Sequence, residues 1–472
     1  MLPVFLLSLL GLILLMLVIM TYYLRNVKAA YEESDDAGDP EAERRKDAVT
    51  GSQNFVYASL VAVSLGMVAA LYLVLRGTVW EGHLMEWMNI VVRLMHITFG
   101  IAWIGASFYF VFLENALNRT KDVRDELAGN LWAVHGGGFY YLEKYKVAPQ
   151  KIPKDLHWFK YEAYFTWVTG FSLLFVVYYF NASAMLIDKN VLDISPMAGV
   201  GIGVGSFIVA WVLYDLLCKS PLIKTGIWFT IIGFLIAVGF AYFYAHVFNS
   251  RAAYIHFGAM LGSIMAANVF FVIIPSQKAM VNAAKTGQPL NPQLGKNAGM
   301  RSLHNNYFTL PVLFVMISNH FPSTFGNDYS WLVLAIITLG TAGVKHYLNL
   351  KEKGQLSVWV LPVSVIILLG AAFITAPDKP GSCKSEVSFA EVNAIIQKRC
   401  ITCHSSKPTD DVYTAAPNGV MYDTPEQIAN LKDKIMQRVV ITKTMPQNNK
   451  TNITQKERDL IRCWIDQGAS LK

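Results

Sequence analysis

Two cysteines followed by a histidine give this sequence its clearest chemical signature. Cys400, Cys403 and His404 form a C-x-x-C-H motif, the attachment sequence of covalently bound c-type haem. The two thiols can form thioethers with the haem vinyl groups, and the adjacent imidazole can become the proximal iron ligand. Half a zinc site and a thioredoxin-like redox pair are the alternatives, but His404 is the only histidine after residue 376 to complete a zinc site. The motif therefore predicts one haem c.

A sulfur ligand for the sixth iron position is expected downstream of the motif. Met445 precedes Pro446 in a polar stretch between two predicted helices, whereas Met436 lies within a predicted helix and Met421 lies before it. We therefore predict that Met445 is the sixth ligand. Because His/Met ligation raises the reduction potential, this haem should accept electrons.

Helix-starting signals surround the motif. Ser388 with Glu391 and Thr454 with Glu457 are capping boxes, and Thr424 precedes a proline at the start of a third helical pattern. They predict one helix running into the motif, one near 425–439 and one near 455–467. First and last helices that flank a haem loop indicate a small class I cytochrome c domain.

Two further cysteines flank these helices. Cys383 precedes the first helix and Cys463 lies in the last, so a disulfide can join the helix ends if the domain lies in an oxidising compartment. Two unpaired thiols are the alternative.

The rest of the chain has a different composition. Of 472 residues, 54% are hydrophobic and 15% charged. This composition excludes an ordinary water-soluble enzyme as the class of the whole protein. The apolar excess fills residues 1–376, and a polar linker at 377–382 separates it from residues 383–472. The net charge of +7 comes from cations between apolar runs, so it indicates membrane topology and no nucleic-acid partner.

Ten apolar segments predict an all-α bundle that crosses the lipid bilayer several times, because each approaches the ~20 residues that a span needs. Lysines and arginines alternate between rich and poor loops, with 22 in one set and three in the other. The positive-inside rule then places both termini outside the cytoplasm. No basic residue precedes the first segment, so we interpret it as an uncleaved anchor rather than a signal peptide. The segments are 2–24, 55–75, 88–113, 162–182, 197–218, 225–247, 252–274, 303–320, 330–349 and 356–375.

Two clusters of polar residues are candidate sites in the membrane region, because ionisable groups inside spans need a partner or a cavity. Near the outer face, His96, His256 and Arg93 could hold a membrane haem b, with His320 close to the same face. Gly258, Gly262 and Ala266 follow His256 at four-residue intervals, a spacing that admits either a neighbouring helix or a flat cofactor. We predict a cofactor site there.

A second cluster is predicted near the cytoplasmic face. Its candidate catalytic residues are His135, His157, Glu162, His304 and Asn305. Three glycines follow His135; they could present backbone N–H groups to an anion or could act as a hinge, and no Walker motif is present.

These motifs together resemble the bacterial membrane-bound urate oxidase, or urate hydroxylase, family. The similar stretches are 93–115, 135–162, 304–322 and the C-terminal cytochrome, which together cover nearly the whole chain. The resemblance implies oxidation of urate to 5-hydroxyisourate with oxygen from water, and transfer of electrons to the fused haem c. It also implies an inner-membrane enzyme with a periplasmic cytochrome that passes electrons to a soluble cytochrome c or a terminal oxidase. Family members have fewer spans, so the first segment is a departure.

Two other functions compete with this interpretation. In one, membrane b haems carry electrons from quinol to the cytochrome, and no purine site exists. In the other, the spans only tether the cytochrome; ten spans with polar interiors exceed what a tether needs. The choice of electron donor, urate or quinol, separates the two main functions.

Overall fold

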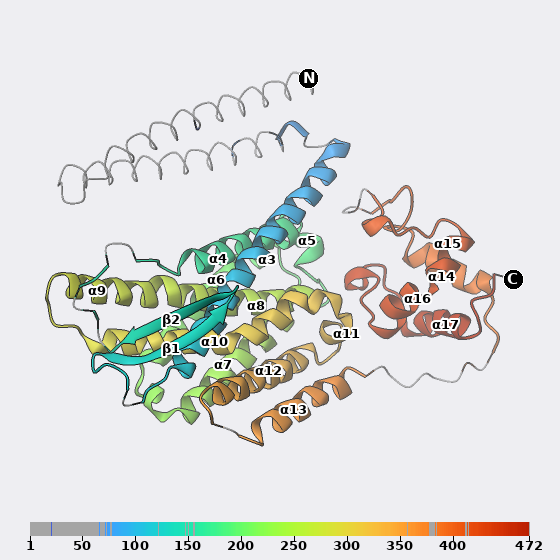
Figure 1. Ribbon diagram of the computed structural model, residues 1–472. Helices are drawn as coiled ribbons and strands as arrows, with labels where there is room; N and C mark the ends of the chain where they lie inside the picture. Colours follow the sequence, from blue (N-terminus) through green and yellow to red (C-terminus); the bar gives the residue numbers. More distant parts are fainter. Residues whose placement is uncertain are drawn as a thin grey trace. The chain divides into compact units, whose positions relative to one another are not determined.

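The structure is a computed structural model that describes residues 78–376, 383 and 385–471, apart from 121, 147, 150, 154, 155, 356, 411, 412 and 414 (Figure 1). Nearer the N-terminus it describes only residues 20, 66, 71 and 73–75. All but one residue of the predicted span at 2–24, most of that at 55–75 and the predicted linker at 377–382 lie outside the described residues. The chain forms two compact units, Met1–Ile90 and Val91–Lys472, and the second contains the candidate sites.

The membrane region is a bundle of helices, as the apolar segments predict. Five helical segments of the described chain are long and apolar enough to cross a membrane, and α13 is a shorter apolar helix. They indicate a membrane protein. The helices of the bundle are α3 (Val79–Ala116), α4 (Tyr161–Leu174), α5 (Ala182–Met185), α6 (Pro196–Lys219), α7 (Ile227–Ala245), α8 (Ser250–Ala267), α9 (Ile274–Lys285), α10 (Pro292–Ile317), α11 (Pro322–Phe325), α12 (Ser330–Glu352) and α13 (Val360–Ile374).

Helix α8 supplies much of the core of the bundle. Tyr254, Phe257 and Met260 are each 1% exposed, in a cluster that also takes residues from α6, α7 and α10. A Cβ atom at Gly258 would lie 2.4 Å from Cγ1 of Val315, so the glycine lets α8 and α10 approach closely. At this position the small-residue spacing therefore serves helix packing.

Two helices of the bundle continue into π-helical turns. Segment η1 (Phe175–Tyr179) extends α4, and η3 (Asn268–Ile273) joins α8 to α9. Asn268, the first residue of η3, is fully buried. Such turns change the direction of the side chains that follow, and they are frequent at functional sites.

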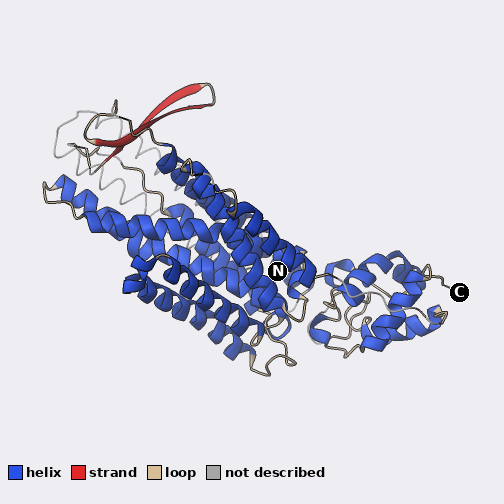
Figure 2. Ribbon diagram, turned by 90° about the horizontal axis from the view of Figure 1, so that it is seen from below, coloured by secondary structure: helices blue, strands red, loops and turns tan. Residues whose placement is uncertain are grey.

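The segment after α3 corrects the all-α prediction, because it forms an antiparallel hairpin of β1 (Leu127–His135) and β2 (Gly138–Tyr145). Figure 2 shows the two strands extending away from the helices. Gly136 and Gly137 have φ angles of 58° and 79° and form the two-residue loop, for which the left-handed region is required. The glycines that could have formed an anion site or a hinge are therefore the turn of this hairpin.

The C-terminal part is a separate small helical fold. It comprises α14 (Phe389–Arg399), α15 (Pro425–Asn430), α16 (Lys432–Ile435), a π-helical turn η6 (Met436–Ile441) and α17 (Gln455–Asp466). All three predicted caps are present as capping boxes, at Ser388, Thr424 and Thr454. Trp464, 1% exposed, packs against Phe389, so the first and last helices meet as predicted.

A disulfide ties these helices together. Cys383 and Cys463 are bonded, with Cα atoms 5.5 Å apart. The prediction that they pair is confirmed, and the bond closes a loop of 80 residues around the C-x-x-C-H motif.

Candidate functional site

The C-x-x-C-H motif follows α14 directly. Cys400 is the C-cap of that helix, and both Cys400 and Cys403 are free thiols. The His404 Nδ1 lies 3.0 Å from the carbonyl oxygen of Val420. When Nδ1–H donates to that oxygen, Nε2 keeps its lone pair for a metal, which is the usual arrangement of a haem-ligating histidine. The motif therefore fits a c-type haem.

The protonation states in the motif agree with this fit. Burial raises the pKa of the Cys400 thiol to about 12, and burial followed by the neighbouring Asp410 carboxylate raises that of Cys403. Burial also lowers the pKa of His404, which favours the neutral imidazole that binds iron. No third His, Cys, Asp or Glu joins the two thiols in a metal-binding group within the described part of the chain. A zinc thiolate site, which needs more ligands, is disfavoured.

A buried arginine, Arg458, holds the backbone of Met445. The Arg458 guanidinium donates to the carbonyl oxygen of Met445 at 2.8 Å and to that of Val439. Burial lowers the pKa of Arg458, and this side chain lies close enough to the Cys400 thiol to affect its titration. Cys400 of the motif and Met445, the predicted sixth ligand, thus pack in the same hydrophobic core of the domain, to which α17 also contributes.

The loop after Met445 also contacts the membrane bundle within the second compact unit. The Gln447 amide donates to the carbonyl oxygen of Ala184 at 2.6 Å, and the Asn448 amide donates to that of Ile187 at 2.9 Å. Asn190 in turn donates to the carbonyl oxygen of Asn448 at 3.2 Å. These bonds join the segment beside the predicted sixth ligand to α5 and to the turn that follows it.

His96, the first of the two predicted outer ligands, packs against α4. Its Nδ1 lies 3.0 Å from the carbonyl oxygen of Thr166 and 3.2 Å from the hydroxyl of Thr169. A Cβ atom at Gly170 would lie 2.7 Å from the ring, so the glycine makes room for the imidazole. His96 thus has one ring nitrogen engaged and one available. Arg93, one turn earlier on α3, is exposed.

His256, the second predicted ligand, has no exposed surface and no available ring nitrogen. Nδ1 lies 2.8 Å from the carbonyl oxygen of Ala252, and Nε2 lies 3.0 Å from the Tyr179 hydroxyl. A Cβ atom at Gly203 would lie 3.0 Å from Nε2. Five aromatic rings surround the imidazole, those of Tyr178, Tyr179, Phe207, Tyr244 and Phe248.

The outer histidines therefore do not fit a haem held by both His96 and His256. Iron would have to displace a hydrogen bond of His256 and open its aromatic surroundings. His320 is exposed, in a short turn after α10. We derive no step through a membrane haem.

Around η3, the structure brings together two of the residues predicted for the inner cluster. Arg301, 3% exposed, forms an ion pair with Asp215 at 2.6 Å and donates to the Asn268 amide oxygen at 3.1 Å. Asn268 in turn donates to Asn305 at 2.8 Å and to the Tyr214 hydroxyl at 3.2 Å, and that hydroxyl lies 2.8 Å from Nδ1 of His304. We call this set the Arg301 network; its members are Tyr214, Asp215, Asn268, Arg301, His304 and Asn305.

The other three residues predicted for that cluster lie elsewhere. His135 ends β1 and is exposed, and His157 is exposed beside the ring of Phe159. Glu162 lies in the first turn of α4, where its Oε2 is buried without a hydrogen-bond partner among the described residues. The prediction missed Arg301 and Asp215, although charges within or beside apolar spans are a signal of a buried site.

A second group of buried polar residues lies on α10 and α12. Lys345 is 2% exposed, and its ammonium lies 3.8 Å from the ring centroid of Phe108 on α3. Asn306 and Asn349 are 0% and 3% exposed. Neither amide has a hydrogen-bond partner in the part of the chain that the structure describes. We call Asn306, Lys345 and Asn349 the Lys345 cluster; none of them was among the predicted site residues.

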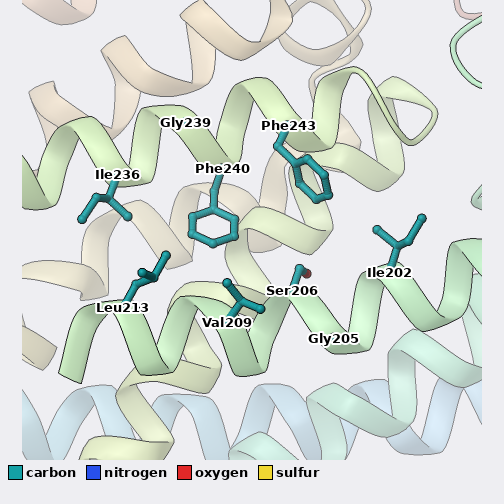
Figure 3. Close-up of a pocket in the computed structure, with 9 residues that line it drawn as sticks. All are labelled: Ile202, Gly205, Ser206, Val209, Leu213, Ile236, Gly239, Phe240 and Phe243. Atoms are coloured by element: carbon teal, nitrogen blue, oxygen red, sulfur yellow. The ribbon is translucent and has the colours of Figure 1, made fainter. Parts of the chain in front are cut away.

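A groove of about 540 Å³ lies between α6 and α7 (Figure 3). Val209 and Leu213 face Phe240 and Phe243 across it, and Ser206 supplies a hydroxyl that is already hydrogen-bonded to Tyr244 at 2.7 Å. A heterocyclic anion needs several converging polar groups, so this apolar groove is not a suitable site for one.

The fold and these sites define a helical membrane protein that buries two polar clusters in its bundle and carries a C-x-x-C-H motif in a separate helical domain. Residues 82–376 match the urate oxidase N-terminal family, and the chain belongs to that family. Membership indicates an oxidoreductase with a urate-related function. No curated protein and no solved structure matches the chain.

Proposed function

We propose that this protein is an inner-membrane enzyme that oxidises urate to 5-hydroxyisourate, takes the added oxygen from water, and delivers the electrons to a c-type haem in its C-terminal domain. Family membership supports the substrate class. The observation that carries the electron route is the C-x-x-C-H motif, with two free thiols and a His404 imidazole oriented through Val420.

The reaction requires a one-electron acceptor used twice. A urate monoanion and one water give neutral 5-hydroxyisourate, one proton and two electrons. Bound haem c supplies the acceptor, and a soluble cytochrome c or terminal oxidase then takes the electrons onward. Oxygen gas is not consumed by urate in this scheme, so no hydrogen peroxide is formed at the site.

The residues of this chain have separate tasks. Cys400 and Cys403 would hold the haem covalently, and His404 and Met445 would bind its iron. The hydrogen bonds from Gln447 to α5 and from Asn448 to the turn after it keep the Met445 loop against the bundle, and short separations favour electron transfer. The helical bundle isolates substrate and base from bulk water, which strengthens the polar interactions inside it.

The test uses full-length protein with its haem, purified in detergent. Oxidised protein is mixed anaerobically with urate and, separately, with a quinol, and the absorption spectrum of the haem is followed. Urate should reduce the haem in the absence of oxygen, and product formed in ¹⁸O-labelled water should contain the label. Reduction by quinol alone would overturn the proposal in favour of a quinol-to-cytochrome module.

Two variants separate haem attachment from haem ligation. Cys400→Ala with Cys403→Ala should leave no haem on the denatured chain and abolish urate-driven reduction. Met445→Ala should keep the covalent haem but change its low-spin spectrum and lower its midpoint potential. An unchanged spectrum and potential in Met445→Ala would require another sixth ligand.

A further inference from the structure

The two buried clusters of the bundle differ in whether their hydrogen bonds are satisfied. In the Arg301 network, the ion pair with Asp215 and the bonds of Asn268 leave only the Arg301 Nε unpaired among the described residues. In the Lys345 cluster, both amides are unpaired. A buried amide without a partner is costly, so its retention indicates a ligand that supplies the missing bonds.

Contacts along α3 and α12 show which faces of these helices meet. The ammonium of Lys345 lies over Phe108, and seven residues further along both helices the Asn115 amide donates to Glu352 at 3.1 Å. Seven residues are two helical turns, so these pairs lie on one face of each helix. Asn349, one turn from Lys345, shares the α12 face that lies against α3.

Helix α10 lies beside this face of α12. The hydroxyl of Tyr307 lies 2.7 Å from Nδ1 of His346, and it also lies beside the Asn349 amide. Asn305, on the other side, donates to the carbonyl oxygen of Met265 on α8. Asn306 lies between these two faces of α10 and is fully buried, which places it in the interior beside α12.

Glu162 lies on α4, which meets α3 and α10 at Gly100. A Cβ atom at Gly100 on α3 would lie 4.0 Å from both Thr166 of α4 and Met316 of α10. Glu162 precedes Thr166 by one turn, toward the end of α4 that is level with the inner part of α3. Measured along the axis of α3, the unpaired Oε2 of Glu162 is therefore within about two helical turns of Phe108 and Lys345.

We infer that Lys345, Asn306 and Asn349 bind the urate anion in the seam between α3, α10 and α12, and that Glu162 is the base that activates water. This inference rests on the proposed function. It assigns the substrate to the unsatisfied cluster and gives the Arg301 network a structural role.

The chemistry of urate matches the unsatisfied groups. Its negative charge pairs with the Lys345 ammonium, and its lactam edges, each with an N–H beside a C=O, complement the carboxamides of Asn306 and Asn349. Phe108 offers an aromatic face to the flat ring. When the water oxygen bonds to C5 of urate, Glu162 accepts the one proton released, and the two electrons leave for the one-electron acceptor.

Binding can be measured without turnover, because reduced protein cannot accept electrons. Full-length protein is reduced with dithionite, and binding of ¹⁴C-labelled urate is followed by equilibrium dialysis. Lys345→Met should weaken binding about 100-fold, and Asn306→Leu and Asn349→Leu about tenfold or more each. The matched controls are Lys351→Met and Asn282→Leu, which replace exposed residues of α12 and α9 and should bind as the wild type does.

Stability separates a binding role from a structural one. Replacement of an unpaired buried amide by leucine should leave the unfolding temperature of urate-free protein unchanged or raise it, and should abolish the upward shift caused by urate. If both leucine variants unfold at lower temperature without urate and still bind it, the amides are structural and the inference is overturned.

Glu162→Gln tests the base. Binding should remain within about threefold of the wild type, while urate-driven haem reduction should slow at least 100-fold. If wild-type protein is reduced by urate but the Lys345, Asn306 and Asn349 variants bind normally, this site is wrong and the proposed function stands. If wild-type protein neither binds urate nor is reduced by it, both are overturned.

Discussion

The Arg301 network and the Lys345 cluster lie in one helical bundle and bury one cation each, but the surroundings of the two cations differ. Arg301 has a carboxylate, an amide and aromatic rings around it, whereas the ammonium of Lys345 has the face of Phe108 and, without an ion pair, the charge of Glu352 two turns further along α12. A cation whose hydrogen bonds are nearly all made within the protein, as those of Arg301 are apart from its Nε, stabilises the fold and has little left for a ligand. The comparison teaches that burial alone does not identify a site; unsatisfied bonds do.

The largest effect is expected at Arg301. Arg301→Met leaves the Asp215 carboxylate without its buried partner and should lower the free energy of unfolding by about 3–5 kcal/mol. Lys345→Met removes a charge without orphaning a carboxylate and should cost far less. Thermal unfolding of both purified variants checks the contrast, and equal losses would remove the distinction between the clusters.

Two buried asparagines provide a matched pair of smaller effect. Asn268→Ala breaks bonds to Arg301, Asn305 and Tyr214 and should cost about 2–3 kcal/mol, since several polar groups lose a partner. Asn306→Ala breaks none and should change stability mainly through lost packing. Chemical unfolding followed by circular dichroism would compare them; a greater loss at Asn306 would contradict the assignment.

A more exposed ion pair in the C-terminal domain tests whether the stabilisation by a paired charge depends on burial. Glu457 pairs with Arg399 at 2.9 Å. Burial raises its pKa, but the bonds from Thr454 and Arg399 outweigh this, so the pKa is lowered overall. The stabilisation is therefore present above the unfolded-state carboxyl pKa and is lost as the pH falls through the folded value. Glu457→Gln should cost about 1 kcal/mol or less at neutral pH and should flatten the acid side of the stability profile.

The smallest effect is expected at Lys219, which pairs with the outer oxygen of Asp215 at 2.6 Å while its own side chain is 69% exposed. Lys219→Met should change the free energy of unfolding by less than about 0.5 kcal/mol. A loss comparable to that of Arg301→Met, measured under the same conditions, would mean that both cations are needed to neutralise the carboxylate.

Local patterns allowed the caps, the first and last helices and the disulfide of the C-terminal domain to be predicted, whereas the single helix predicted near 425–439 is divided into α15, α16 and η6. Capping boxes, a C-x-x-C-H motif and the position of Cys383 each act over a few residues or at helix ends, so their consequences can be derived from spacing. The apolar segments predicted the bundle helices for the same reason.

The membrane site could not be predicted to the same extent, because its residues come together from distant helices. Lys345 was counted as a loop cation, and Asn306 and Asn349 carry no local signal. His135 and Glu162 both follow α3 in sequence, but the hairpin carries His135 away from the helices. The hairpin itself was missed because its strands expose apolar residues such as Trp132 and Phe139 and lack a clear buried face.

The π-helical turn η3 makes the length of its segment as important as its composition. A π-helical turn contains one residue more than an α-helical turn, so the chain beyond it is rotated by about 100° relative to an uninterrupted helix. Asn268 reaches Arg301 and Asn305 from the first position of this turn. Deletion of a single residue from Asn268–Ile273 would convert the turn to regular α-helix and rotate all of α9 relative to α8. Homologous chains that keep the Arg301 network should therefore tolerate substitutions in this segment more readily than a change in its length.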